Sequence, residues 1–307
     1  MSAPSPAHRQ QHPLPMRDGV APSYLWLPEG QWPDMITFLA AHFADVPEST
    51  WRERMARGHV VDGDGKPLAP HSAYRRGMRI FYYRELDEAE TPIPFQEEIL
   101  FMDDHLVVVD KPHFLPMTPT GRFLHETLLV RLKKTLGEPA LTPIHRLDRE
   151  TAGVVIFSRR QESRGAYQSL FQQRVIEKEY EALAPRLDGV QFPFTYKSRM
   201  VDGDKFFIMK EEEGEPNSET IIDLIEHHID CTRYRLFPHT GRKHQLRLHL
   251  ASLGIPIIND AFYPQALPSK PDNYSKPLKL LARRICFLDP ITNDWREFSS
   301  LRKLYTC

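Results

Sequence analysis

The chain has 307 residues, which suffices for roughly two domains of ~150 residues, at least one of them with a sizeable core. Hydrophobic residues make up 41% and charged residues 26%, and no apolar run approaches the ~18 residues of a membrane-spanning helix, so we expect a soluble protein. Forty Lys and Arg against 41 Asp and Glu give a net charge of -1, which argues against a protein that coats nucleic acid through bulk charge.

The first 33 residues contain seven prolines and few aliphatic side chains. We therefore expect residues 1–33 to form an irregular arm, with folding beginning at Asp34. Asp34 is a good N-cap for a helix over 34–41, and a second short, basic helix is predicted over 47–57.

Two strand-like runs, 60–61 and 79–84, flank the turn signal Asp62-Gly63-Asp64-Gly65. Together with the two helices they predict a compact module over 34–84. The acidic, proline-bearing stretch 85–94 is predicted to be a linker, and 95–307 a second, larger domain.

The larger domain mixes helix and strand patterns without a regular βαβ alternation. This predicts an α+β fold built on a mixed, mostly antiparallel sheet. Helices are predicted over 123–136 (with a stop at Gly137) and 162–174, and strands over 99–102, 106–111, 154–158, 175–183, 205–210, 218–224 and 232–237.

Two segments carry local positive charge despite the neutral total. Residues 52–84 contain eight basic and three acidic residues, and residues 233–249 contain five basic residues and no acid. Each segment alone is typical of a solvated surface, but two of this density favour a polyanionic partner.

Asp148 is the first candidate for chemistry. It lies between Arg146 and Arg149, directly before the apolar run 154–158. Positive charge on both sides would keep the carboxylate ionised and suited to act as a nucleophile or base. The alternative is a salt-bridged cap on a turn.

A second candidate segment runs from Thr240 to His249. Gly241 permits a tight turn, and leucines at helical spacing would leave Arg247 at the edge of a packed face, where it could pair with a buried carboxylate or hold phosphate. Tyr180 lies on a predicted strand. Its hydroxyl is a candidate for chemistry, and the alternative is that Tyr180 is an ordinary core residue.

A metal site has little support in the sequence. His239, His244 and His249 recur every five residues, which does not place them on one helical face. The three cysteines, 231, 286 and 307, form no CxxC pair, and residues 1–15 contain no apolar leader. These features argue against zinc and favour a reducing cytoplasm.

Four motifs in order resemble the RluA-type family of RNA pseudouridine synthases, from about Ile93 to the end of the chain. They are His145-Arg146-Leu147-Asp148-Arg149-Glu150-Thr151-x-Gly153, Lys178-x-Tyr180, Thr240-Gly241-Arg242-x-His244-Gln245-Leu246-Arg247-x-His249 and Gly254-x-Pro256-Ile257-x-x-Asp260-x-x-Tyr263. Val107 to Pro112 matches the opening of the family's catalytic domain, and 34–84 resembles the small α-L RNA-binding module that often precedes it.

The resemblance implies the pseudouridine synthase fold and an enzyme that isomerises uridine to pseudouridine in RNA without cofactor or metal. It implies an RNA partner, with ribosomal RNA favoured and transfer RNA second, no DNA or membrane, and a cytoplasmic monomer. In this interpretation Asp148 is the nucleophile, and Arg146 takes the place of the extruded uridine.

Further roles follow from the same resemblance. Tyr180 stacks on the base and is the candidate for removing the C5 proton, Arg247 pairs with the catalytic aspartate, and Leu280 packs near the base. Arg149, Arg242 and His244 are the remaining substrate-binding candidates.

Three residues depart from the family pattern: Ala152 replaces a usual Ser, Asn259 a common Gly, and Leu281 a frequent His. None is a proposed catalytic residue. The main alternative function is a non-catalytic RNA-binding or ribosome-assembly factor, and the intact Asp148, Tyr180 and Arg247 argue against it. A histidine-rich metal hydrolase is a weaker alternative.

Overall fold

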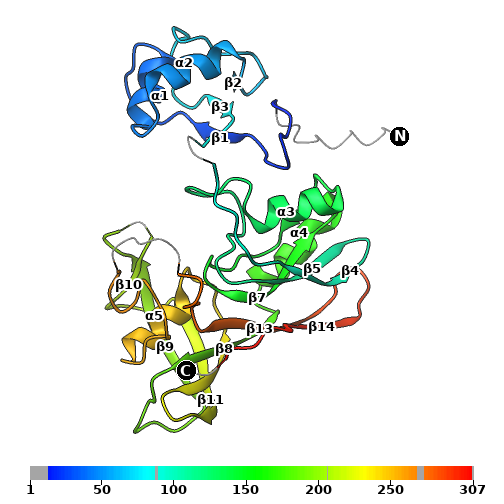
Figure 1. Cartoon of the computed structure of the whole chain (residues 1–307), viewed down its shortest axis with the longest axis vertical. Coiled ribbons are helices and arrows are strands. Elements are labelled where there is room, and N and C mark those ends of the chain that lie inside the picture. The colour runs from blue at the N-terminus through cyan, green and yellow to red at the C-terminus, as the bar shows by residue number, and fades with distance from the viewer. Residues whose placement is uncertain (1–12, 87–88, 206, 268–272, 306–307) are drawn as a thin grey trace. The chain divides into compact units, whose positions relative to one another are not determined.

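The computed structural model describes residues 13–86, 89–205, 207–267 and 273–305 (Figure 1). The chain divides into two compact units, Met1–Glu90 and Thr91–Cys307, and the division falls within the stretch 85–94. No helix in the described ranges is long and apolar enough to cross a membrane.

The N-terminal unit packs two helices on a three-stranded antiparallel sheet of order β1-β3-β2. Its elements are β1 (Ser23–Trp26), α1 (Met35–His42), α2 (Glu48–Ala56), β2 (Val60–Asp62) and β3 (Arg79–Tyr82). Both predicted helices are confirmed, and Asp34 caps α1 by accepting a hydrogen bond from the amide of Thr37 at 3.0 Å. The core includes Phe38, Leu39 and Trp51, all nearly or fully buried.

The prediction that residues 1–33 form an irregular arm is wrong for its second half. β1 pairs with β3 along its whole length, and Leu27 is buried in the core of the unit. Pro22 and Pro28 lie on either side of the strand, so they bound a run of aromatic and aliphatic residues that suits a sheet. Residues 1–12 lie outside the described part of the chain.

The second unit is built on an 11-stranded sheet with the path β10-β9-β11-β12-β8-β13-β7-β5-β4, to which β14 and β6 add at β13 and β7. Among the described strands every pair is antiparallel except β13 with β7, which confirms the predicted α+β class. The strands are β4 (Glu98–Met102), β5 (Leu106–Lys111), β6 (Thr142–Pro143), β7 (Ala152–Ser158), β8 (Glu177–Ala184), β9 (Phe194–Asp202), β10 (Met209–Glu212), β11 (Ser218–His227), β12 (Thr232–Pro238), β13 (Leu280–Leu288) and β14 (Trp295–Ser299), and the helices are α3 (Leu128–Leu136), α4 (Gln161–Gln172) and α5 (Gln245–Ser252).

Two predicted elements have different bounds in the structure. α3 begins only at Leu128, because Thr127 adopts an extended conformation and its side chain caps the helix. Of the predicted strand 205–210, Lys205, Phe207 and Ile208 lie outside any strand, residue 206 is not among the described residues, and β10 begins at Met209. The strands β9, β13 and β14 were not predicted, because Lys or Arg interrupts the apolar pattern of each.

Gly153 is required where β7 lies against β13. It pairs with Ala282, its φ is +116°, and a Cβ added there would collide with the Ala282 carbonyl oxygen.

We expect Gly153→Ala to lower the free energy of unfolding by about 3 kcal/mol, from backbone strain plus overpacking. Denaturant unfolding measures this. Gly165→Ala on α4, where the added methyl meets open space, is the matched control and should be neutral or slightly stabilising. A Gly153→Ala protein as stable as the control would contradict the prediction.

Candidate active site

Asp148 lies on the loop between β6 and β7, and the backbone of this loop is held from two sides. The Nε2 of His145 accepts a hydrogen bond from the amide of Ile156 at 3.1 Å. The Nζ of buried Lys111 donates to the carbonyl oxygens of Pro112, Leu115 and Arg149 at 3.0, 2.8 and 3.0 Å. The loop is therefore preorganised, as a catalytic loop on a rigid scaffold must be.

Burial lowers the pKa of Lys111 to about 7, and the nearby carboxylates of Glu150 and Asp148 oppose this shift. Lys111 donates all its hydrogen bonds to backbone oxygens, so its part at the site is to position the loop.

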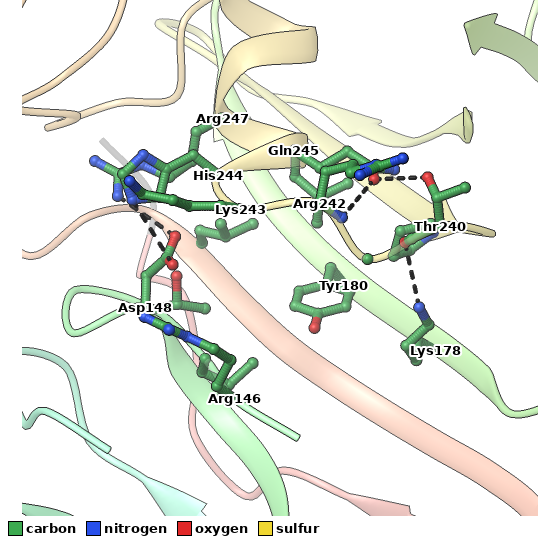
Figure 2. Close-up of a pocket in the computed structure, with 16 residues that line it drawn as sticks. Arg146, Asp148, Lys178, Tyr180, Thr240, Arg242, Lys243, His244, Gln245 and Arg247 are labelled. Atoms are coloured by element: carbon green, nitrogen blue, oxygen red, sulfur yellow. Dashed lines mark hydrogen bonds and ion pairs between the residues drawn. The ribbon is translucent and has the colours of Figure 1, made fainter. Parts of the chain in front are cut away.

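Arg247 lines the pocket and lies between the carboxylates of Asp260 and Asp148. Its guanidinium, 1% exposed, donates to both oxygens of Asp260 at 2.8 and 2.7 Å, and Asp260 is itself fully buried. The third nitrogen, Nη1, lies 3.5 Å from Oδ2 of Asp148 (Figure 2) and 3.8 Å from Oε2 of Glu150. Burial works against the charged form of Arg247, but the ion pairs with Asp260, Asp148 and Glu150 outweigh it and raise its pKa.

The prediction that the charges of Arg146 and Arg149 lie on both sides of the Asp148 carboxylate is wrong. Arg149 forms an ion pair with Glu150 at 3.0 Å, and its guanidinium lies over the ring of Phe123 at 5.2 Å. The side chain of Arg146 is exposed and has no hydrogen bond or ion pair with any described residue. Neighbouring side chains on a turn point in different directions, so the cation beside Asp148 comes from Arg247, 99 residues along the chain.

Tyr180 lines the same pocket from β8 (Figure 2), and Leu280 lines it from β13. Its ring packs against two core clusters of the second unit. Burial, followed by the negative charge of Asp148, raises the pKa of the Tyr180 hydroxyl. The hydroxyl is therefore protonated at neutral pH.

The turn before α5 forms the opposite wall. The Oε1 of Gln245 accepts hydrogen bonds from the Thr240 hydroxyl at 2.6 Å and the Arg242 amide at 3.1 Å, which fixes the turn. His244 has φ of +55°, contacts the Tyr263 hydroxyl through Nδ1 at 3.1 Å and lies 3.8 Å from Asp148 through Nε2. Burial lowers the pKa of His244, so the ring is neutral near pH 7.

The hollow between these walls measures about 180 Å³. That is below the ~300–1,000 Å³ of pockets for drug-sized ligands and suits one flipped base. Every predicted site residue lines it except Arg149, which lines a neighbouring hollow with residues 116–120. The lining residues are Arg146, Leu147, Asp148, Thr151, Lys178, Tyr180, Pro238, Thr240, Gly241, Arg242, Lys243, His244, Gln245, Leu246, Arg247 and Leu280.

No role could be assigned from the sequence to Asp260, Gln245 or Lys178, although all three stand inside the family motifs. Asp260 and Lys178 contact residues of other segments, and Gln245 fixes the turn of its own motif. Lys178 reaches the Thr240 carbonyl at 3.4 Å, and burial lowers its pKa to about 8.

Two of the departures from the family pattern face each other. Ala152 and Leu281 are register partners between β7 and β13, and both are fully buried in one apolar cluster. A polar side chain at only one of these two positions would be buried without a hydrogen-bond partner, which is unfavourable. Apolar residues at both positions avoid that cost. Asn259 has φ of +64°, a conformation that Asn tolerates better than most residues.

The three histidines considered for metal binding lie in different environments. His239 is exposed, His244 lies beside Asp148, and buried His249 contacts the hydroxyls of Ser198, Ser218 and Thr220 at 3.2, 2.9 and 3.0 Å. His249 is therefore a satisfied core residue.

Burial lowers the pKa of His249 to about 4, against about 6.5 in the unfolded chain. The unfolded state therefore binds the extra proton, and the stability present above pH ~6.5 is lost as the pH falls toward 4. At pH 5 we expect a loss of about 2 kcal/mol from this residue. Urea unfolding at pH 7.5 and 5 measures the loss, and His249→Gln should reduce it. An identical pH dependence in that variant would contradict the assignment.

Comparison with known proteins agrees with this geometry. The family model for RNA pseudouridylate synthase matches residues 105–252. The dual-specificity RNA pseudouridine synthase RluA of Pasteurella multocida is 32% identical over 209 residues, covering 66% of this chain and 92% of that protein. The mitochondrial tRNA pseudouridine(32) synthase of Saccharomyces cerevisiae is 30% identical over 245 residues, covering 76% of this chain and 51% of that protein.

The structure of human RNA pseudouridylate synthase domain containing 1 shares the fold with a TM-score of 0.57 at 21% identity, covering 70% of this chain and 86% of that one. The matched residues include the Asp148 loop, β8 and all of α5. The motifs, the fold and the relatives agree, and the chain belongs to the RluA-type family of RNA pseudouridine synthases, which are isomerases.

Proposed function

We propose that this enzyme converts uridine to pseudouridine in ribosomal RNA with Asp148 as the nucleophile. One observation carries the proposal: a partly exposed carboxylate stands at the mouth of a base-sized pocket, 3.5 Å from the buried Arg247, in a pocket that Tyr180 also lines. Arg247 is fixed by Asp260, so it supplies a preorganised positive charge beside Asp148.

The reaction breaks the bond between C1′ of the ribose and N1 of uracil and forms a bond from C1′ to C5. The proton on C5 leaves, and N1 ends with a proton. Asp148 either attacks C1′ to form an ester, or removes a ribose proton to give a glycal, and the released uracil rotates within the pocket before the new bond forms. Both routes need a site that retains the free base and excludes water.

Tyr180 would serve this sequence in two ways. Its ring offers a stacking surface for the base, and its hydroxyl is the candidate for carrying the C5 proton. The charge of Asp148 is one cause of the raised pKa of Tyr180. Asp148 loses that charge on either route, which lowers the pKa of Tyr180. Only after Asp148 has reacted can the hydroxyl therefore readily give its proton to the released uracil and then, as a phenolate, accept the proton from C5.

The other residues of the site take roles around the base. Arg146, exposed and without a partner among the described residues, is suited to replace the flipped uridine in the RNA stack. Leu280 packs near the base, and Arg242 and His244 line its pocket. Arg149 would contact RNA at the neighbouring hollow. We place the enzyme in the cytoplasm as a monomer. Its RNA-binding module is the N-terminal unit, which comprises residues 34–84 together with β1.

Transfer RNA is the second candidate substrate, because one relative is named a dual-specificity enzyme and another a tRNA pseudouridine synthase. The test is tritium release from RNA labelled at C5 of uridine, taken from cells that lack this gene and separated into ribosomal and transfer fractions. Release from ribosomal RNA supports the proposal, and release from transfer RNA alone moves the assignment to the second candidate. Binding without release from either fraction would favour the non-catalytic factor.

A further inference from the structure

Most arginines of the basic segment 52–84 are neutralised within the N-terminal unit. The four pairs, with their nitrogen–oxygen distances, are Arg52 with Glu48 at 2.6 Å, Arg54 with Glu85 at 3.1 Å, Arg57 with Glu53 at 3.5 Å and Arg76 with Glu29 at 2.8 Å. Three of these acids lie outside residues 52–84. The net charge of that segment alone therefore overstates the positive charge that is available to a partner. Helix α2 is a poor candidate for the main RNA contact.

The opposite face of the small sheet has a different chemistry. Tyr24 and Trp26 on β1 are 53% and 58% exposed, and the guanidinium of Arg79 on β3 lies 4.1 and 5.5 Å from their ring centres. It also lies 4.5 Å from the ring of Phe81. We call Tyr24, Trp26 and Arg79 the stacking face.

Arg79 has no hydrogen bond or ion pair with any described residue, and its Nε is buried without a partner. A second cation lies on an aromatic ring of the same face of the sheet: Arg17 is 3.7 Å from the ring centre of Tyr83, which packs with Phe81. Arg17 contacts His59 but no carboxylate among the described residues. This face therefore offers planar rings and positive charge that no carboxylate of the described residues neutralises.

We infer that the stacking face binds unpaired bases of the substrate RNA. Exposed aromatic rings stack on any base, and a guanidinium both stacks and attracts phosphate. A protein partner without acidic groups would have to bury the unpaired Arg79, whereas RNA brings the anion with the base. This inference rests on the proposed function and specifies where the N-terminal unit contacts RNA.

Binding of the full chain to a fluorescent single-stranded oligonucleotide of adenosine and cytidine tests the inference, because this probe contains no uridine to be converted. We expect Tyr24→Ala and Trp26→Ala each to weaken binding roughly 5- to 100-fold. Both side chains are more than half exposed, so unchanged melting temperatures should show that the fold is kept. Binding of a duplex of the same length should change far less.

Two kinds of control separate stacking from general effects. Trp295→Ala removes a comparably exposed Trp, 59%, from the second unit, and Arg52→Ala removes a paired arginine of α2. Each should change affinity by less than about twofold. Arg79→Lys keeps the charge but loses the planar group, so it should weaken binding while leaving its salt dependence nearly unchanged.

Equal affinity of wild type and Trp26→Ala would overturn the inference. A Trp26→Ala protein that sediments differently from wild type but binds RNA with the same affinity would also overturn it. That result would assign the stacking face to contact with a second copy of the chain. If wild type releases no tritium from any RNA while the Trp26 effect on binding persists, only the proposed function fails. If tritium is released and Trp26→Ala leaves both binding and KM unchanged, only this inference fails.

Discussion

Asp148→Asn should lower tritium release roughly 10³-fold or more, because in the described part of the chain Asp148 is the only carboxylate that lines the pocket. The substitution should cost less than about 1 kcal/mol of stability. The Asp148 side chain is 19% exposed, and its contacts with Arg247 and His244 are 3.5 and 3.8 Å long. Single-turnover tritium release and denaturant unfolding on the same preparation measure both quantities.

Glu150→Gln is the matched control for the loss of Asp148. Glu150 lies two residues away and 3.8 Å from Arg247, and its exposure, 20%, is nearly the same. We expect this variant to keep activity within about tenfold of wild type, since it only tunes the charge around Arg247. An Asp148→Asn protein as active as Glu150→Gln would show that Asp148 is not the nucleophile.

Arg247→Met should remove both activity and stability. Asp260 is fully buried and would lose its bidentate partner, and breaking such a buried pair costs about 3–5 kcal/mol. Asp148 would also lose its nearest cation. Urea unfolding and tritium release are the measurements.

The double variant Arg247→Met with Asp260→Leu separates these two effects. Replacing both members of a buried ion pair by apolar side chains can restore stability. We expect it to recover much of the lost stability but not the activity. Recovery of activity would mean that Arg247 acts only as a structural partner of Asp260 and does not assist Asp148.

The sequence predicted those parts of the molecule whose determinants are local. Asp34 followed by an apolar run indicated α1, and the motif around Asp148 indicated the catalytic loop. The family resemblance also placed Arg247 with Asp148. The geometry beyond that could not be predicted, because the strongest partner of Arg247 is Asp260, whose role depends on how the segment after α5 returns to the helix.

The N-terminal unit shows the same limit. Proline frequency alone suggested an arm, but β1 forms because the residues between two prolines find a partner in β3, more than 50 residues later. The pairing of Arg54 with Glu85 was equally invisible to a count within one segment. Local pattern predicts helices well, whereas strand partners and ion pairs are properties of the folded chain.

The position of β13 makes the pocket depend on a strand that is synthesised after both segments that carry Asp148 and Tyr180. β13 lies between β7, which follows the Asp148 loop, and β8, which carries Tyr180, so it joins the two halves of the sheet that bear the site (Figure 1). Its residues, Leu280–Leu288, follow those of every other strand on the path from β10 to β4. A nascent chain that ends before β13 lacks the strand that places Asp148 and Tyr180 in one pocket, and such non-local pairing is slow to form. The pocket can therefore assemble only after synthesis has passed Leu288, so we expect shorter nascent chains to be inactive.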